Sequence, residues 1–275
     1  MNAEPWAFGE PVAGYRWRPD GTPRATLLLA HGLAEYAERY VEHYHRLIPT
    51  LVARGVAVHA WDYRGHGASP GARGVVDVAE AVRQHRAARA ALRGAGPLFC
   101  LGHSLGGLVT AASIAQDGAG VAGAVLSAPA LLIEAPGGLK WVGRAVAWAR
   151  PGAGIRPALD PAGISRLPDE VAAYRDDPRC YRGKLPAITG ASALAVSEAG
   201  WARYPGWRTP VLALHGTADT FTDPRGSERF VATIAAKDKT LALFDDGRHE
   251  LLNDDERDRA LTLVLAWLEA RFGRG

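Results

Sequence analysis

Lysine and cysteine are both scarce in this sequence. Only four of its 32 basic residues are lysines, and the arginines are interleaved with acidic residues along the whole chain. A protein that binds nucleic acid needs a basic stripe, so no nucleic-acid partner is expected. The two cysteines, Cys100 and Cys180, form no spaced pattern, which argues against a disulfide framework and against a cysteine-based metal site. Cys100 is expected to be a small core residue.

Long hydrophobic runs are also missing. Residues 121–133 form one of the longest apolar stretches, and they are too few for a membrane-spanning helix of ~20 residues. The first residues, MNAEPWAFGEP, carry acidic residues and prolines where a secretory signal has a basic and then an apolar segment. We therefore predict a cytoplasmic protein. Its net charge of +3 would permit transient contact with an anionic membrane surface.

Apolar runs alternate with segments of helical periodicity along most of the chain. This alternation predicts an α/β fold, a mostly parallel sheet with helices on both faces. The strands are expected at 25–32, 56–62, 97–104, 121–129, 209–216 and 239–246, and the helices at 36–54, 75–92, 105–116, 224–236 and 254–272. Residues 14–19, followed by the turn DGTP, predict a hairpin with the strand at 25–32 and hence an antiparallel leading edge.

Residues 131–188 interrupt the alternation. This stretch is rich in proline and glycine, and a connection of this length inside a compact domain is usually functional. We interpret it as a helical cap inserted into a core formed by residues 1–130 and 189–275.

The stretch LFCLGHSLGGLVT at 98–110 contains a serine between a predicted strand and a predicted helix. Gly102, Ser104 and Gly106 match G-x-S-x-G, in which the serine sits on a sharp turn and a Cβ at either glycine would clash with the neighbouring strand and helix. The alternative is a glycine-rich connection with an incidental serine. The pattern in this context predicts that Ser104 is a nucleophile. The N-terminus of the helix that begins at Leu105 would favour a developing oxyanion.

A serine nucleophile needs a base and an orienting acid. In a parallel sheet these should follow the serine in the order acid and then histidine, at the same edge of the sheet. Asp219 follows the strand at 209–216 and His249 follows the strand at 239–246, so we predict these two. Asp223 and Asp245 are alternatives for the acid. His66 is the alternative base, although it precedes Ser104.

The remaining histidines predict neither a metal site nor a second base. His43 and His45 are two residues apart and do not share a helix face, and His103 is expected to point away from the nucleophile. No metal and no cofactor are expected. The loop HGLAEYAERY at 31–40 should supply the second oxyanion donor, the N–H of Leu33.

Several motifs together resemble one hydrolase family. HGLAEYAERY, DYRGHGAS, GHSLGG, DPRCYRGKLPA, HGTADTFTD and HELLND resemble the bacterial monoacylglycerol lipase and lysophospholipase group of the α/β-hydrolase superfamily, over residues 12–272. The resemblance implies a nucleophile at Ser104, an acid at Asp219, a base at His249 and oxyanion donors at Leu33 and Leu105. It also implies a helical cap that admits single-chain lipids.

The combined expectation is a cofactor-independent serine esterase that cleaves the ester of a single-chain lipid, with a monoacylglycerol as the expected substrate. A general carboxylesterase, a lysophospholipase and a non-catalytic receptor of the same fold are the alternatives. The cap is the element left to bind the fatty chain. We expect the chain to contact these apolar residues: Leu131, Leu132, Ile133, Leu139, Trp141 and Val142. The cap would also make any transient contact with a membrane. The sequence predicts no oligomeric state.

Overall fold

An eight-stranded, mostly parallel sheet forms the centre of the molecule in the computed structural model, which describes residues 1–134 and 137–272. The strand order is β1-β2-β4-β3-β5-β6-β9-β10, and β2 runs antiparallel to both β1 and β4. The strands are β1 (Glu4–Pro5), β2 (Gly14–Trp17), β3 (Ala25–Ala30), β4 (Val56–Trp61), β5 (Leu98–His103), β6 (Val121–Ser127), β9 (Val211–Gly216) and β10 (Lys239–Phe244). The predicted α/β fold class is confirmed.

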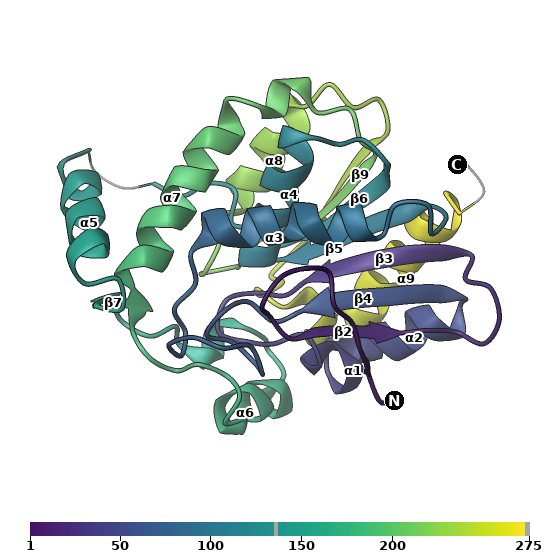
Figure 1. Cartoon of the computed structure of the whole chain (residues 1–275), viewed down its shortest axis with the longest axis horizontal. Coiled ribbons are helices and arrows are strands. Elements are labelled where there is room, and N and C mark those ends of the chain that lie inside the picture. The colour runs from purple at the N-terminus through teal and green to yellow at the C-terminus, as the bar shows by residue number, and fades with distance from the viewer. Residues whose placement is uncertain (135–136, 273–275) are drawn as a thin grey trace.

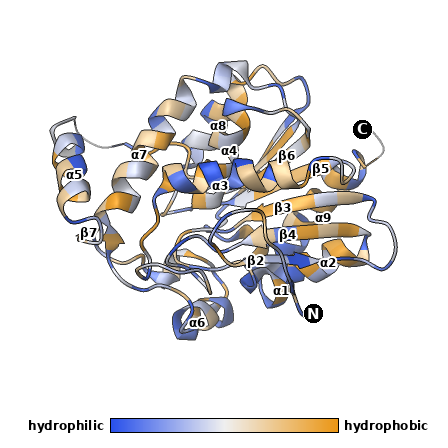
Figure 2. Ribbon diagram, in the orientation of Figure 1, coloured by the Kyte–Doolittle hydropathy of each residue, from blue (hydrophilic) through white to orange (hydrophobic). Residues whose placement is uncertain are grey.

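Helices cover both faces of this sheet (Figure 1). One face carries α3 (Val78–Ala91), α4 (Leu105–Gln116), α7 (Ala187–Trp201) and α8 (Pro224–Thr233). The other carries α1 (Arg39–Glu42), α2 (Leu47–Ala53) and α9 (Arg257–Glu269). Because both faces are covered, the central strands are hydrophobic along their length rather than alternating, as β3 and β4 are in Figure 2.

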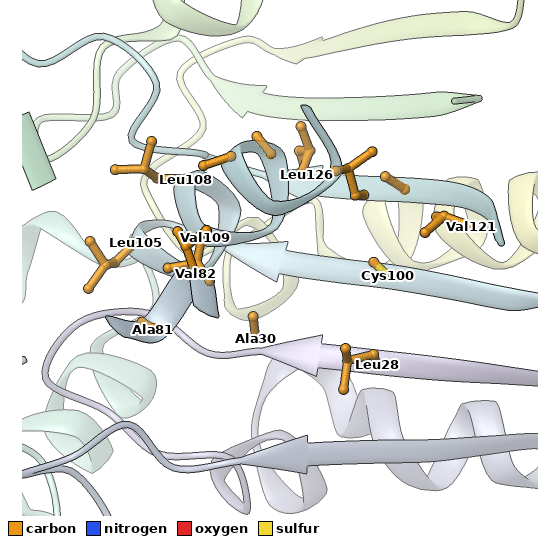
Figure 3. Packing of buried hydrophobic residues seen from close by; sticks show 14 of the residues in the cluster. Leu28, Ala30, Ala81, Val82, Cys100, Leu105, Leu108, Val109, Val121 and Leu126 are labelled. Atoms are coloured by element: carbon orange, nitrogen blue, oxygen red, sulfur yellow. The ribbon is translucent and has the colours of Figure 1, made fainter. Parts of the chain in front are cut away.

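The helix α4 packs directly over the central strands (Figure 3). Leu105, Leu108 and Val109 on α4 belong to the same buried cluster as Val82 on α3 and Cys100 on β5. Cys100 is fully buried, as expected of a small core residue. This packing fixes α4 against β5, and the turn between these two elements holds Ser104.

Two local expectations are wrong. Residues 36–54 do not form one helix, because Tyr44, His45 and Arg46 have φ angles of 53°, 53° and 52°, in the left-handed region that a right-handed helix cannot include. The ring of Tyr44 stacks on Tyr40 with centroids 3.8 Å apart, and its N–H donates to the Asn253 side chain. These tertiary contacts outweigh the local helical preference.

The expected hairpin between residues 14–19 and 25–32 is also absent, since β2 pairs with β4 and β1 instead. Gly14 faces Trp61 and Trp17 faces Val58 across the ladder. The leading edge is antiparallel, as predicted, but through a different partner.

Residues 131–188 connect β6 to α7 outside the sheet. Their elements are α5 (Gly137–Ala149), β7 (Gly154–Arg156), the 3-10 turn η2 (Pro161–Gly163), α6 (Pro168–Asp176) and β8 (Leu185–Pro186). The strands β7 and β8 form a separate antiparallel pair. Figure 1 shows α5 beside α7 at one end of the molecule, away from the sheet. Within the described ranges, no helix combines the length and apolar composition that a bilayer span requires.

Candidate active site

Ser104 lies on the turn between β5 and α4, and its backbone is strained. Its φ of 54° and ψ of −117° lie outside the regions that residues with a Cβ normally adopt. Two backbone hydrogen bonds hold the turn. The Ser104 N–H donates to the Ser127 carbonyl at 2.9 Å, and the Ser104 carbonyl accepts the Ala130 N–H at 3.0 Å. The turn projects Ser104 at the carboxyl edge of the sheet.

The glycine at position 106 is required by a close backbone approach. A Cβ on Gly106 would lie 2.0 Å from the carbonyl oxygen of Ala30 and 2.5 Å from that of His31. A Cβ on Gly102 would meet the Gly106 carbonyl at 2.3 Å. The helix can therefore start this close to β3 only with glycines at both positions. This steric requirement is the one that the sequence pattern suggested.

Asp219 and His249 meet across the ends of β9 and β10. His249 Nδ1 is 2.7 Å from Asp219 Oδ2, and neither side chain is more than 6% exposed. The other carboxylate oxygen, Oδ1, accepts the backbone N–H groups of Phe221 at 2.8 Å and Thr222 at 3.1 Å. Asp219 is thus held by its own loop and is aimed at His249. Because Nδ1 pairs with Asp219, Nε2 is the imidazole nitrogen that remains for other contacts.

The pKa values of this pair move apart. Burial alone would raise the pKa of Asp219, but the charges of His249 and His215 and their hydrogen bonds hold it well below its ordinary value. Burial alone would lower the pKa of His249, but the Asp219 carboxylate raises it above its ordinary value. The pair therefore favours an ionised aspartate and stabilises a positive charge on His249.

The alternative acids and the alternative base do not reach this pair. Asp223 caps α8 by accepting the Arg225 N–H at 2.9 Å and pairs with the same guanidinium. Asp245 accepts from Thr217 at 3.3 Å on an exposed edge. His66 is 1% exposed and packs against Tyr63 and His31, and burial lowers its pKa to about 3.

His103 was expected to point away from the site, and this expectation is wrong. Its ring centroid lies 4.7 Å from that of His249, and it lines the same pocket as Ser104. Its Nδ1 lies 3.2 Å from the Ser127 carbonyl, a pairing that requires a proton on Nδ1. Burial and the nearby His249 together lower the pKa of His103 to about 4. His103 is therefore a neutral neighbour of the pair near neutral pH.

Ser104 and His249 line the same small pocket. Its walls are both polar and apolar. The residues that line it are Gly32, Leu33, Glu35, His103, Ser104, Leu159, Ile164, Tyr174, Phe221, His249 and Glu250. Three of them, Leu159, Ile164 and Tyr174, come from the 131–188 segment. The backbone N–H of Glu250 also donates to the Ile164 carbonyl at 2.8 Å, so this segment contacts the loop that carries His249.

Five of the six apolar residues expected to contact a fatty chain do not line this pocket. Leu131 is fully buried in the core, and Leu132 and Ile133 are half-buried beside α8 and the core. Trp141 and Val142 on α5 are 73% and 57% exposed. The Leu139 side chain lies outside the described residues.

The turn that carries Leu33 lies beside Ser104. A Cβ added to Gly32 would be 3.3 Å from the Ser104 Cβ, so the two backbones approach closely. Ala34 has a φ of 70°, which turns the chain sharply after Leu33. In the described part of the chain, the N–H groups of Leu33 and Leu105 donate to no other group.

Comparison with known proteins identifies the family. A family model described as "Serine aminopeptidase, S33" matches residues 21–256. The chain belongs to this hydrolase family. Among curated relatives of this S33-family hydrolase, a monoacylglycerol lipase of Mycolicibacterium smegmatis is 34% identical over 92% of this chain and 90% of its own length. The human monoglyceride lipase is 31% identical over 86% of this chain and 78% of its own length.

Solved structures agree with this assignment. The crystal structure of a monoacylglycerol lipase from Paleococcus ferrophilus has a TM-score of 0.84 and 33% identity, and the match covers 94% of this chain and 99% of that one. A monoglyceride lipase from Saccharomyces cerevisiae, crystallised with a substrate analogue, has a TM-score of 0.81 at 23% identity and supports the fold. The S33-family hydrolase is an α/β-hydrolase, as the sequence motifs suggested.

Two side chains that support Asp219 were not singled out from the sequence. His215 Nε2 lies 3.2 Å from Asp219 Oδ2, while its Nδ1 is 2.7 Å from Ser227 Oγ. The Thr222 hydroxyl donates to the same Asp219 oxygen at 2.7 Å. The HG at 215–216 repeats the HG at 31–32, and this repeat was the available signal for His215, whereas no pattern marked Thr222.

Proposed function

We propose that this S33-family hydrolase cleaves the carboxylic ester of a monoacylglycerol, with Ser104 as nucleophile, His249 as base and Asp219 as the orienting acid. The observation that carries the proposal is the 2.7 Å contact between His249 Nδ1 and Asp219 Oδ2, beside a serine on a strained turn in the same pocket. Monoacylglycerol is proposed because relatives above 30% identity are named as lipases of this substrate.

The reaction proceeds in two halves. His249 Nε2 takes the proton from Ser104 as its oxygen attacks the ester carbonyl, and the N–H groups of Leu33 and Leu105 bind the oxyanion. His249 then gives this proton to the departing glycerol oxygen, which leaves an acyl-serine. Water, deprotonated by His249, attacks the acyl-serine, and His249 then returns the proton to the Ser104 oxygen as the fatty acid leaves. Asp219 holds the imidazole with its proton on Nδ1 and stabilises the imidazolium.

The pocket wall suits a substrate with a polar headgroup and an apolar chain. Tyr174, Glu35 and Glu250 form its polar part, and Leu159 and Phe221 belong to its apolar part. The Tyr174 hydroxyl, which is both a donor and an acceptor, can exchange hydrogen bonds with the hydroxyls of the glycerol headgroup.

Aminopeptidase activity, which the family description suggests, is the second candidate. Such an enzyme needs a free carboxylate for the substrate's ammonium group. Glu35 and Glu250 are the carboxylates in the pocket wall, and both are occupied. Glu35 accepts hydrogen bonds from the Gly32 N–H, from Arg39 and from two tyrosine hydroxyls. Glu250 accepts hydrogen bonds from Nη1 and Nη2 of Arg39 and from the Asn253 side chain. The ester reaction is therefore favoured.

A substrate panel tests this assignment. We expect the purified protein to release glycerol and fatty acid from a monoacylglycerol at least 100-fold faster than it cleaves an aminoacyl-naphthylamide, because the pocket offers no free carboxylate. Glycerol release is followed enzymatically and naphthylamine by fluorescence. Faster cleavage of the naphthylamide would make the protein an aminopeptidase. Failure to cleave any ester would support the non-catalytic receptor.

We also propose that residues 131–188 act as a cap and that α5 contacts lipid surfaces transiently. Trp141 and Trp148 are 73% and 89% exposed, and Arg144 lies 5.8 Å from the Trp141 ring centroid. Exposed tryptophan beside basic residues favours the interface of an anionic bilayer. The chain-binding wall, in contrast, is supplied by Leu159 and Phe221 in the pocket.

Two variants separate these roles of the segment. Leu159→Asn should lower the ratio of octanoyl to acetyl p-nitrophenyl ester turnover about 3- to 10-fold, since buried methylenes contribute about 0.8 kcal/mol each. The double variant Trp141→Ser/Trp148→Ser should leave this ratio unchanged but weaken sedimentation with phosphatidylglycerol vesicles. A ratio that falls only in the double variant would place the chain along α5 instead.

A further inference from the structure

Four polar side chains form a buried group beside His249, which we call the Arg39 network. Its members are Glu35, Arg39, Glu250 and Asn253, and none is more than 3% exposed. They come from parts of the chain that are distant in sequence: the turn after β3, the short helix α1, and the segment that follows His249. The network thus joins two loops that the sheet alone does not connect.

Arg39 is the centre of this network. Its Nη1 donates to Glu250 Oε1 at 2.7 Å and its Nη2 donates to Glu250 Oε2 at 3.0 Å, in a two-pronged pairing. The same Nη1 donates to Glu35 Oε2 at 3.1 Å. A planar guanidinium can hold both carboxylates in fixed positions, whereas the point charge of lysine cannot.

Each carboxylate is fixed next to a part of the proposed reaction machinery. Glu35 Oε1 accepts the Gly32 N–H at 2.5 Å and so holds the turn that presents Leu33. Glu250 directly follows His249, and Asn253 donates to Glu250 Oε2 at 2.6 Å. Both carboxylates also form part of the wall of the pocket that contains Ser104.

The Arg39 network is not a favourable way to stabilise the fold. Burying two carboxylates and one guanidinium costs desolvation energy that well-packed apolar side chains would avoid. One guanidinium neutralises only one of the two carboxylates. The group therefore carries an excess negative charge close to His249, where a positive charge forms during the proposed reaction.

We infer that the Arg39 network is a positioning device for the proposed ester hydrolysis. It holds the oxyanion turn and the His249 loop in register, and its excess negative charge favours the protonated form of His249 that arises as Ser104 attacks. Its members are positioning residues, since they act through the Gly32–Leu33 turn and through His249. The inference rests on the proposed function.

Electrostatics around His249 agree with this inference. The charged and titratable groups near its ring are Asp219 and His215 from the β9 side, His103 from β5, Glu35 and Arg39 from the turn and α1, and Glu250 from its own loop. Burial lowers the pKa of His249, and Asp219 raises it. The charges of Glu250 and Glu35 raise the pKa of His249 as well. Since only neutral His249 can accept the serine proton, activity should fall as the pH drops through this raised pKa.

Glu250→Gln is the decisive variant, because it removes one negative charge while keeping the size of the side chain. The pKa of His249 should fall, so the acidic limb of kcat/KM should move to lower pH by about half a unit or more. The imidazolium is then less stabilised, and kcat should drop roughly 10-fold. The assay uses a soluble p-nitrophenyl ester, and rates are divided by the active sites counted with a fluorophosphonate. Loss of folded protein then does not imitate the effect.

Arg39→Lys separates charge from geometry. It keeps the positive charge and loses the two-pronged pairing, so we expect the acidic limb to stay in place while kcat per active site falls and KM changes little. Glu35→Gln should move the limb in the same direction as Glu250→Gln. This variant replaces Glu250→Gln in the test if that protein does not fold.

Glu256→Gln is the matched control. It is the same substitution six residues further along, and Glu256 is an exposed partner of Arg259 at 2.9 Å. Its pH profile and kcat should equal those of the wild type. An unmoved limb and an unchanged kcat per site in Glu250→Gln, or in Glu35→Gln if it replaces that variant, would overturn the inference. An absence of ester turnover in the wild type would instead overturn the proposed function.

Discussion

Ser104→Ala is expected to abolish ester hydrolysis and to leave the fold intact. The hydroxyl is the proposed attacking group, and removing the nucleophile of such a triad typically costs about 10⁶-fold in kcat. Alanine should also be tolerated structurally, because the strained φ of 54° is imposed by the turn between β5 and α4 whichever side chain is present. Loss of glycerol release and loss of labelling by a fluorophosphonate would be measured together.

A second serine provides the control for this experiment. Ser127 ends β6, next to the Ser104 turn, and its carbonyl accepts the Ser104 N–H. Ser127→Ala keeps this backbone contact and should retain both labelling and turnover. Labelling that persists in Ser104→Ala would move the nucleophile elsewhere in the chain. Thermal unfolding of both variants should resemble that of the wild type.

Asp219→Asn is expected to lower kcat about 10⁴-fold without preventing labelling completely. The amide N–H of an asparagine can donate a hydrogen bond to Nδ1, whereas the aspartate can only accept one from it, so the substitution favours the wrong imidazole tautomer. The loss should be smaller than that of Ser104→Ala, because the serine and the oxyanion donors remain. Single-turnover kinetics with an activated ester would measure the slow acylation directly.

Asp223→Asn distinguishes the two nearest candidates for the acid. Asp223 caps α8 and pairs with Arg225, and it has no contact with His249 among the described residues. We expect near wild-type kcat and a loss of about 0.5–1 kcal/mol in the free energy of unfolding, because asparagine still caps a helix well. A larger loss of activity in Asp223→Asn than in Asp219→Asn would reassign the acid.

The order of elements and the proposed triad could be read from the sequence because they depend on local patterns. Continuous apolar runs identify strands buried on both faces, and the glycines at 102 and 106 identify a turn on which a Cβ does not fit. Parallel strands bring their carboxyl ends to one edge. The positions of Asp219 and His249 just after two strands were therefore sufficient to expect that they meet near Ser104.

The strand partner of β2 and the break at 44–46 could not be read in this way. The hairpin signal at residues 14–24 was local, but β2 gains its ladder with β4, which lies some forty residues further along the chain. The left-handed turn at Tyr44, His45 and Arg46 is held by contacts with residues distant in sequence, such as the Tyr44 N–H to Asn253, which no helical periodicity contains.

The sequence by itself determined the α/β class, the family motifs and the residues proposed for the chemistry, since each follows from a short pattern with a local physical cause. Only the tertiary structure decided what surrounds them. It brought His103 against His249, paired Glu250 with Arg39, and left Trp141 and Val142 exposed while Leu159 and Phe221 line the pocket. These contacts join residues tens to hundreds of positions apart, and side-chain packing and charge pairing across loops, rather than local propensity, select them.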